Sequence, residues 1–151
     1  MKTLQLLLLM ALETGCGFST EASPTIVVEP SSPAIGDEGA LVEAVGIETL
    51  GGVFTPLLRP GCATPCELTE VFSTAADNQD QIAITLFRGD GPTTSSATLL
   101  GEYRIEGIPP MARGVPTINV RFAAEDGNLT LGAIDAVTSK PMRLIPVEPR
   151  R

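Results

Sequence analysis

Short apolar segments with strict alternation constrain this chain more than any other feature. In residues 81–87 an apolar side chain occurs at every second position, so Ile82, Ile84 and Leu86 lie on one face of an extended strand. Residues 117–123 repeat the pattern with inward Ile118, Val120 and Phe122. This two-residue period predicts half-buried β-strands.

Eight such segments follow one another from residue 40 onward. Turn signals such as Gly51-Gly52 and Asp126-Gly127 separate them, and the 151 residues include 15 Gly and 13 Pro. No segment after Gly39 has the period of a helix of useful length. The predicted strands cover residues 40–50, 52–58, 70–74, 81–87, 99–105, 117–123, 128–134 and 141–147. Their spacing predicts an all-β sandwich.

The first 16 residues have the pattern of an export signal. Lys2 precedes an apolar run from Leu4 to Leu12, which is too short for the roughly 20 residues of a membrane span but fits a signal peptide. Gly15-Cys16 follows at once, as in bacterial lipoprotein signals, whose cysteine is lipidated after cleavage. Such signals usually carry Leu three places before the cysteine, where this chain has Glu13.

We therefore expect an exported protein of the cell envelope, anchored through lipid at Cys16. The alternatives are a plain signal peptide cleaved nearby, or a misassigned start that would leave the protein in the cytoplasm. Residues 17–39 are rich in Ser, Pro and Glu and predict a flexible linker. Inside the linker, residues 25–28 (TIVV) could form only an edge strand, because Pro24 and Pro30 flank them. Residues 40–148 form the predicted domain, and 149–151 a tail.

The composition excludes some function classes. The net charge of −8 argues against nucleic acid as a partner, because phosphate contacts need basic patches. The chain has no His, the usual general base and metal ligand, so we expect neither an enzyme nor a metal site. The acidic pairs Asp77/Asp80 and Glu125/Asp126 occur in polar, turn-like runs and fit solvated turns.

Cys62 and Cys66 occur in the loop sequence PGCATPC. Three residues separate them, whereas redox Cys-x-x-Cys motifs have two, and zinc would need about four ligands. If Cys16 is lipidated, the other two form a pair that could be a disulfide outside the cytosol. The loop must then fold back to bring the Cα atoms within about 7 Å. Two free thiols are the alternative.

Five motifs in order carry a family resemblance over residues 46–146. They are GIETLGGVFTPLL, VFSTAADNQ, LFRGD, EGIPPMARGVPTINVRF and DGNL. Together they resemble the substrate-binding domain of the DnaK-type, seventy-kilodalton heat-shock chaperones. The resemblance implies a sandwich of two four-stranded antiparallel sheets. It also implies a channel between loops at one end that holds an extended apolar peptide of an unfolded protein.

The resemblance also implies the peptide-binding residues by position. Leu50 and Ala75 would form an arch over the bound backbone, and Ile82 would lie at the pocket floor, where relatives often have Val. Taken alone, the inward Ile82, Ile84 and Ile118 fit ordinary core residues. The implied peptide-binding set is Ile47, Thr49, Leu50, Val53, Phe72, Thr74, Ala75, Gln79, Ile82, Ile84 and Ile118.

Parts of the family pattern are not found in the sequence. The chain has no Gly-rich phosphate loop, so we expect no cofactor here, although family members use ATP through a separate nucleotide-binding domain. The helical lid is also not found, and Arg113 matches a position that contacts it. The leading hypothesis is passive, chaperone-like peptide binding. The alternatives are a structural or adhesive lipoprotein whose channel is non-functional, and a truncated remnant of an ATP-dependent chaperone. The oligomeric state is left open.

Overall fold

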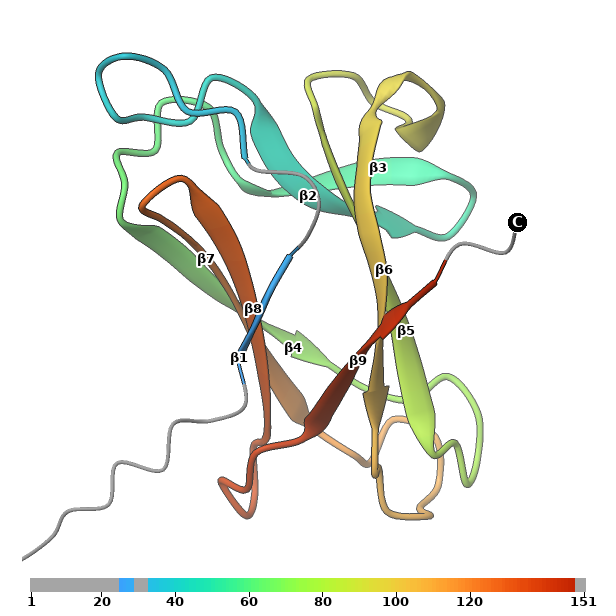
Figure 1. Cartoon of the computed structure of the whole chain (residues 1–151). Helices are drawn as coiled ribbons and strands as arrows, with labels where there is room; N and C mark the ends of the chain where they lie inside the picture. Colours follow the sequence, from blue (N-terminus) through green and yellow to red (C-terminus); the bar gives the residue numbers. More distant parts are fainter. Residues whose placement is uncertain (1–24, 29–32, 149–151) are drawn as a thin grey trace, which may run out of the picture.

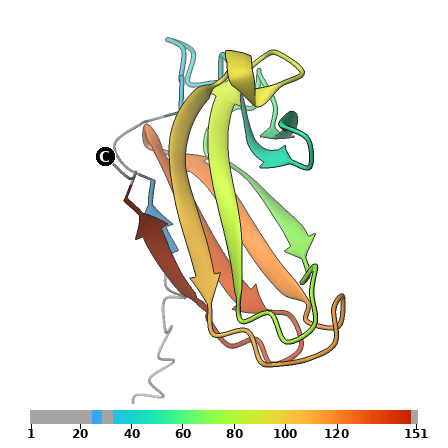
Figure 2. The same cartoon turned by 90° about the vertical axis from the view of Figure 1, so that its right-hand side faces the viewer.

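The computed structural model describes residues 25–28 and 33–148, and in this part of the chain nine strands form two packed antiparallel sheets (Figures 1 and 2). One sheet has four strands in the order β1-β8-β7-β4, and the other has five in the order β3-β2-β5-β6-β9. The strands are β1 (Thr25–Val27), β2 (Ala44–Thr49), β3 (Val53–Leu58), β4 (Cys66–Phe72), β5 (Gln81–Gly89), β6 (Thr98–Glu106), β7 (Ile118–Glu125), β8 (Asn128–Asp135) and β9 (Arg143–Val147). A 3-10 turn, η1 (Thr94–Ser96), lies between β5 and β6.

The all-β sandwich is confirmed, and the eight predicted strands correspond to β2 through β9. The expectation of two four-stranded sheets is wrong, because five of the predicted strands form one sheet and the other three are joined by a ninth strand, β1. This strand lies within the predicted linker and pairs with β8 from Thr25↔Gly132 to Val27↔Thr130. Val28 then donates its N–H to the carbonyl of Leu129 (2.8 Å) and is only 3 % exposed. Burial of this apolar side chain gives a physical reason for the pairing.

The outer edge of β8 is occupied along its length. The half that β1 leaves open is covered by the chain just before β9, where Met142 donates its N–H to the carbonyl of Ala133 (2.9 Å). Asp135 likewise donates its N–H to the carbonyl of Lys140 (2.9 Å). Strand β9 itself pairs with β6 and so becomes the fifth strand of the other sheet.

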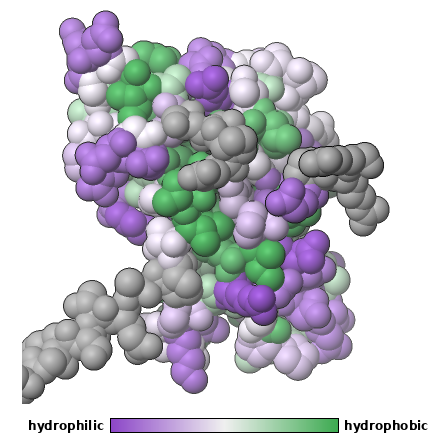
Figure 3. Space-filling view, in the orientation of Figure 1, coloured by the Kyte–Doolittle hydropathy of each residue, from purple (hydrophilic) through white to green (hydrophobic). Residues whose placement is uncertain are grey.

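The core lies between the two sheets and consists of the inward residues of alternating strands. Leu86, Ile105 and Phe122 have no exposed surface, as their two-residue periodicity requires. The rings of Phe72 and Phe122 lie 6.3 Å apart, so the end of β4 packs against this core. Figure 3 shows apolar side chains down the middle of the face that carries edge strands β1 and β9. These strands therefore help to close the open side of the sandwich.

Two loops on the same side of the molecule position the candidate site. Gly51 and Gly52 have φ values of 87° and 72° and form the hairpin turn between β2 and β3 that the sequence predicts. This hairpin and the loop of residues 73–80 lie on the right in Figure 1 and face the viewer in Figure 2. Among the residues described, no helix is long and apolar enough to cross a bilayer. The predicted signal segment with Cys16, residues 17–24 of the linker and the tail lie outside the described residues.

Candidate functional site

The β2–β3 hairpin is held by the loop between β5 and β6. Thr94 donates its backbone N–H to the carbonyl of Gly52 (3.0 Å), and its hydroxyl donates to Glu48 Oε2 (2.9 Å). Phe54 donates its N–H to the carbonyl of Pro92 (3.0 Å). We call residues 48–54 together with residues 90–97 the first loop pair. These bonds hold the hairpin although the side chain at its tip, Leu50, is fully exposed.

The loop between β4 and β5 is held in the same way by the loop between β6 and β7. We call residues 73–81 together with residues 107–117 the second loop pair. Its cross-loop bonds run from Ser73 Oγ to the Pro116 carbonyl (2.6 Å), from Asn78 N–H to the Met111 carbonyl (2.8 Å), from Arg113 N–H to Asp77 Oδ1 (2.8 Å) and from Gly114 N–H to the Thr74 carbonyl (3.0 Å).

Gln79 organises the turn within this loop. Its Oε1 accepts hydrogen bonds from the N–H groups of Ala75 (2.9 Å) and Ala76 (3.1 Å). Its Nε2 donates to the carbonyl of Gln81 (2.7 Å). Asn78 beside it has a φ of 55°, a left-handed conformation that Asn tolerates better than most residues. The polar run after the two alanines therefore shapes the loop through side-chain bonds to its own backbone.

Aliphatic side chains from three strands, β2, β5 and β7, lie between the two loop pairs. Ile47 on β2 and Ile82 on β5 are each 8 % exposed, whereas Ile84 and Ile118 are 2 % and 1 % exposed. All four belong to one hydrophobic cluster, against which Phe72 of β4 packs. The structure thus brings together five apolar members of the implied peptide-binding set, and we call these five the floor. Burial alone does not separate a channel lining from an ordinary core.

The remaining predicted residues lie on the loop pairs. The Thr49 hydroxyl is 2.9 Å from that of Thr55, and Val53 is 45 % exposed. Thr74 is the buried polar residue of the site, and its hydroxyl accepts from the N–H of Gly114 (3.2 Å). Because Leu50 is fully exposed, its side chain does not pack on Ala75 in this structure. The arch between Leu50 and Ala75 stays a prediction for a peptide-bound state.

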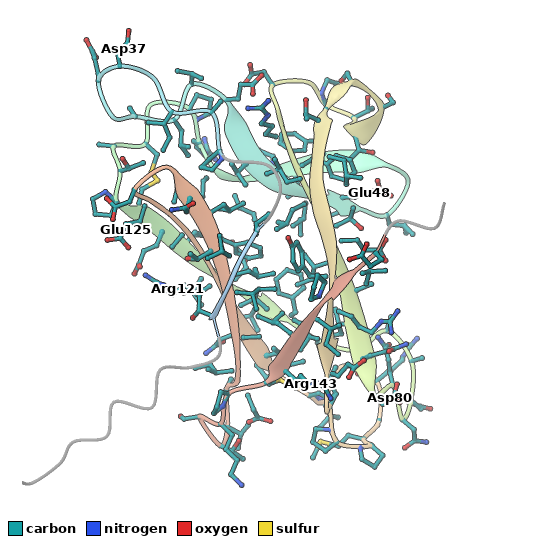
Figure 4. The ribbon with its side chains drawn as sticks, in the orientation of Figure 1. Asp37, Glu48, Asp80, Arg121, Glu125 and Arg143 are labelled. Atoms are coloured by element: carbon teal, nitrogen blue, oxygen red, sulfur yellow. A yellow bond between two sulfur atoms is a disulfide. The ribbon has the colours of Figure 1, made fainter. Side chains whose placement is uncertain are left out.

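Some residues of the site have little signal in the sequence. Glu48 and Thr94 hold the hairpin, and the only sequence signal for them is the Ser/Thr-rich run before β6. Asp77 belongs to a run that the sequence predicts to shape this loop, and its carboxylate accepts a hydrogen bond from the backbone N–H of Arg113 across the pair, a partner that the sequence does not indicate. Figure 4 shows Glu48 and Asp80 on the same side of the molecule, one from each loop pair.

Asp135, a carboxyl with a shifted pKa, lies outside the loop pairs, in the turn between β8 and β9. The backbone N–H of Thr138 donates to Asp135 Oδ1 (2.7 Å) and lowers the pKa of this carboxyl below its ordinary value. The N–H of Val137 (2.9 Å) and the charge of Lys140 act in the same direction, while partial desolvation opposes them. The carboxylate therefore stabilises this turn in its charged form.

Cys62 and Cys66 lie on the opposite side of the molecule from the loop pairs. They are joined as a disulfide with Cα atoms 6.2 Å apart, so the loop does fold back as the bond requires (Figure 4). The redox state of the two cysteines outside the cytosol stays a prediction. Within the described part of the chain, no group of three or more His, Cys, Asp or Glu side chains could hold a metal ion.

These features define a class of protein: a β-sandwich domain with two braced loop pairs on one side and an aliphatic floor between them. The chain belongs to the Hsp70 family, because the profile of the family described as "Hsp70 protein" matches residues 40–149. The resemblance inferred from the sequence motifs is thereby confirmed.

Three relatives illustrate the similarity. The chain is 41 % identical over 103 residues to "Heat shock 70 kDa protein 2" of Paracoccidioides lutzii, a match that covers 68 % of this chain and 16 % of the relative. It is 40 % identical over 109 residues to "Chaperone protein DnaK" of Methanothermobacter thermautotrophicus (72 % and 18 %). It is 42 % identical over 102 residues to "Chaperone protein DnaK" of Burkholderia cenocepacia (67 % and 16 %). The matched part is therefore less than a fifth of each relative.

Proposed function

We propose that residues 40–148 bind extended apolar segments of unfolded proteins between the two loop pairs, passively and without ATPase activity in this chain. The observation that carries the proposal is Leu50, which is fully exposed at the tip of a hairpin braced by hydrogen bonds. Covering one large apolar side chain contributes about 1.5–3 kcal/mol, and the half-exposed Val53 on the same hairpin extends the apolar surface offered to a bound segment. The names of the relatives, which include two chaperones, support the same conclusion.

The expected affinity follows from a small number of contacts. One aliphatic side chain buried against Ile47 and Ile82 contributes about 1.5–3 kcal/mol. Backbone hydrogen bonds to the loop pairs add about 0.5–1.5 kcal/mol each, less the cost of ordering the peptide. A total near −7 to −8 kcal/mol corresponds to a Kd of about a micromolar. Such binding is reversible and needs no cofactor.

The proposal extends to location. We infer that the protein is exported and held at the envelope through lipid at Cys16, so that it would meet extended segments outside the cytoplasm. The support is the signal-like sequence of the first 16 residues.

A labelled Leu-rich heptapeptide tests the binding proposal by fluorescence anisotropy. Ala75→Trp should abolish binding, because Ala75 is exposed on the loop that would close over the peptide and a large ring would obstruct it. Ala83→Trp is the matched control, since Ala83 is exposed on the opposite face of β5 from Ile82 and Ile84. It should leave the affinity unchanged. Equal binding by both variants and the wild type would show that the peptide does not pass under Ala75.

Ile82→Phe tests the floor in the same assay. The larger side chain should fill the space for the peptide's aliphatic group. The peptide would then lose the burial of one side chain, about 1.5–3 kcal/mol, which corresponds to a tenfold or greater loss of affinity. Because Ile82 is mostly buried, circular dichroism and thermal unfolding must show that the variant keeps its fold.

A structural or adhesive sandwich without a working channel is the second candidate. The observation that favours it is the deep burial of Ile84 and Ile118, which are 2 % and 1 % exposed and fill the floor as a core would. Absence of peptide binding up to about millimolar concentration, where binding free energies fall to about −4 kcal/mol, would favour this candidate over the first.

A further inference from the structure

Residues 34–42 form a small hairpin immediately before β2. Val42 donates its N–H to the carbonyl of Ala34 (2.9 Å), and Gly36 donates to the carbonyl of Ala40 (2.9 Å). An isolated bridge joins Ile35 and Leu41. We call residues 34–42 the N-terminal hairpin, because it lies between β1 and β2 in the chain.

The N-terminal hairpin is bound to the loop that contains the two cysteines, and we call residues 59–66 the disulfide loop. Leu41 is 2 % exposed and belongs to the core, so this attachment also determines whether part of the core stays covered. The attaching hydrogen bonds run from Leu41 N–H to the Cys62 carbonyl (3.0 Å), from Gly61 N–H to the Leu41 carbonyl (2.7 Å), and to the Gly39 carbonyl from Thr64 N–H (2.9 Å) and Thr64 Oγ1 (2.8 Å).

The disulfide closes the part of the loop that makes these bonds. Ala63 and Thr64 lie between Cys62 and Cys66, and Ala63 pairs with Ala40. Both cysteine side chains are partly buried against the core but keep some exposure, so a small thiol reagent can reach them. Cys66 also begins β4 and pairs with Ala124 of β7. The bond therefore connects a loop position to a strand position that is fixed by its pairing with β7.

We propose that the Cys62–Cys66 bond is a redox-sensitive fastening that holds the N-terminal hairpin on the sandwich. An external dithiol reduces it by thiol–disulfide exchange: two electrons and two protons pass to the cysteines, and the dithiol becomes a disulfide. Reduction leaves every hydrogen-bonding group in place but frees the loop, so ordering the loop costs more conformational entropy and the hairpin detaches more often.

The fastening is distinct from the proposed peptide site. Figure 1 places the disulfide loop on the left of the molecule and the two loop pairs on the right. None of the four attaching bonds involves a residue of either loop pair. The redox state should therefore change the docking of the N-terminal hairpin, and loss of peptide binding would not by itself affect this inference.

Hydrogen exchange measured by NMR tests the inference on three samples: the oxidised protein, the protein treated with dithiothreitol, and the double variant Cys62→Ser/Cys66→Ser. Protection of the Leu41, Gly61 and Thr64 amides should fall about tenfold in the last two samples, in line with the modest entropy of so short a closed loop. Amides of β5 and β6 should keep their protection and report that the fold is intact.

Two outcomes would overturn the inference. One is unchanged protection at Leu41, Gly61 and Thr64 in the double variant. The other is an equal loss of protection in β5 and β6, which would make the bond a general stabiliser and not a local fastening. A thiol titration of the exported, unreduced protein completes the test, because two reactive thiols would mean that the bond does not form there.

Discussion

Replacement of Gln79 by Ala tests whether the order of the 73–80 loop contributes to peptide binding. The Gln79 carboxamide makes three hydrogen bonds, two from the N–H groups of Ala75 and Ala76 and one to the carbonyl of Gln81. All three lie within the loop that would close over the peptide. Their loss should leave the core intact and allow the loop to open.

The magnitude follows from the position of this side chain. Gln79 is partly exposed, so each bond is expected at the lower end of the usual range, about 0.5 kcal/mol, because water replaces the lost partner. Three bonds give about 1.5 kcal/mol, which is about tenfold in Kd if the loop must be ordered when the peptide binds. The free energy of global unfolding should fall by no more than this amount.

Anisotropy with the labelled heptapeptide and hydrogen exchange at Ala75 and Ala76 measure the two effects. Gln81→Ala is the matched control, because this neighbouring side chain is exposed and only the backbone carbonyl of Gln81 is used. It should match the wild type in both measurements. If Gln79→Ala exchanges faster at Ala75 and Ala76 yet binds peptide with wild-type affinity, the loop order does not contribute to binding and the reasoning is refuted.

Two further predictions concern stability and location. The pKa of Asp135 is lowered in the folded protein, so the stabilisation by its carboxylate is complete above the ordinary value of 3.8 and is lost as the pH falls through the lowered folded value. Urea unfolding should therefore show a stability advantage of the wild type over Asp135→Asn at neutral pH that shrinks under acid; a constant difference would contradict this cause. For export, the wild type should sediment with membranes and Cys16→Ala should be soluble, and identical fractionation would remove the lipid anchor.

The strands that bury alternate residues could be predicted from the sequence. Ile84 and Leu86 are 2 % and 0 % exposed, and the two-residue period that predicts this burial is a local property of residues 81–87. Strand β1 could not be predicted to the same degree. A short apolar run between prolines fits a linker as well as an edge strand, and the decision depends on pairing with Gly132, far along the chain.

The candidate site could also be predicted from the sequence only in part. Its floor could be predicted, because the apolar positions of β2, β5 and β7 are fixed by strand alternation and by the family motifs. The bracing of the loops could not be, because most of its acceptors are backbone carbonyls such as those of Gly52 and Met111. Every residue has such a carbonyl, so the sequence contains no mark of which one is used.

The separate bracing of the two loop pairs has a mechanical consequence. Within the part of the chain that the structure describes, hydrogen bonds join residues inside each loop pair, and none joins one pair to the other. Each pair can therefore tilt about its strand ends without breaking its own bonds. Strands β5 and β6 run from one pair to the other and are hydrogen-bonded along their length, so they fix the separation of the strand ends from which the loops project. The two ends of a proposed peptide site can thus adapt to segments of different bulk by tilting of one loop pair at a time, while the strands between them stay fixed.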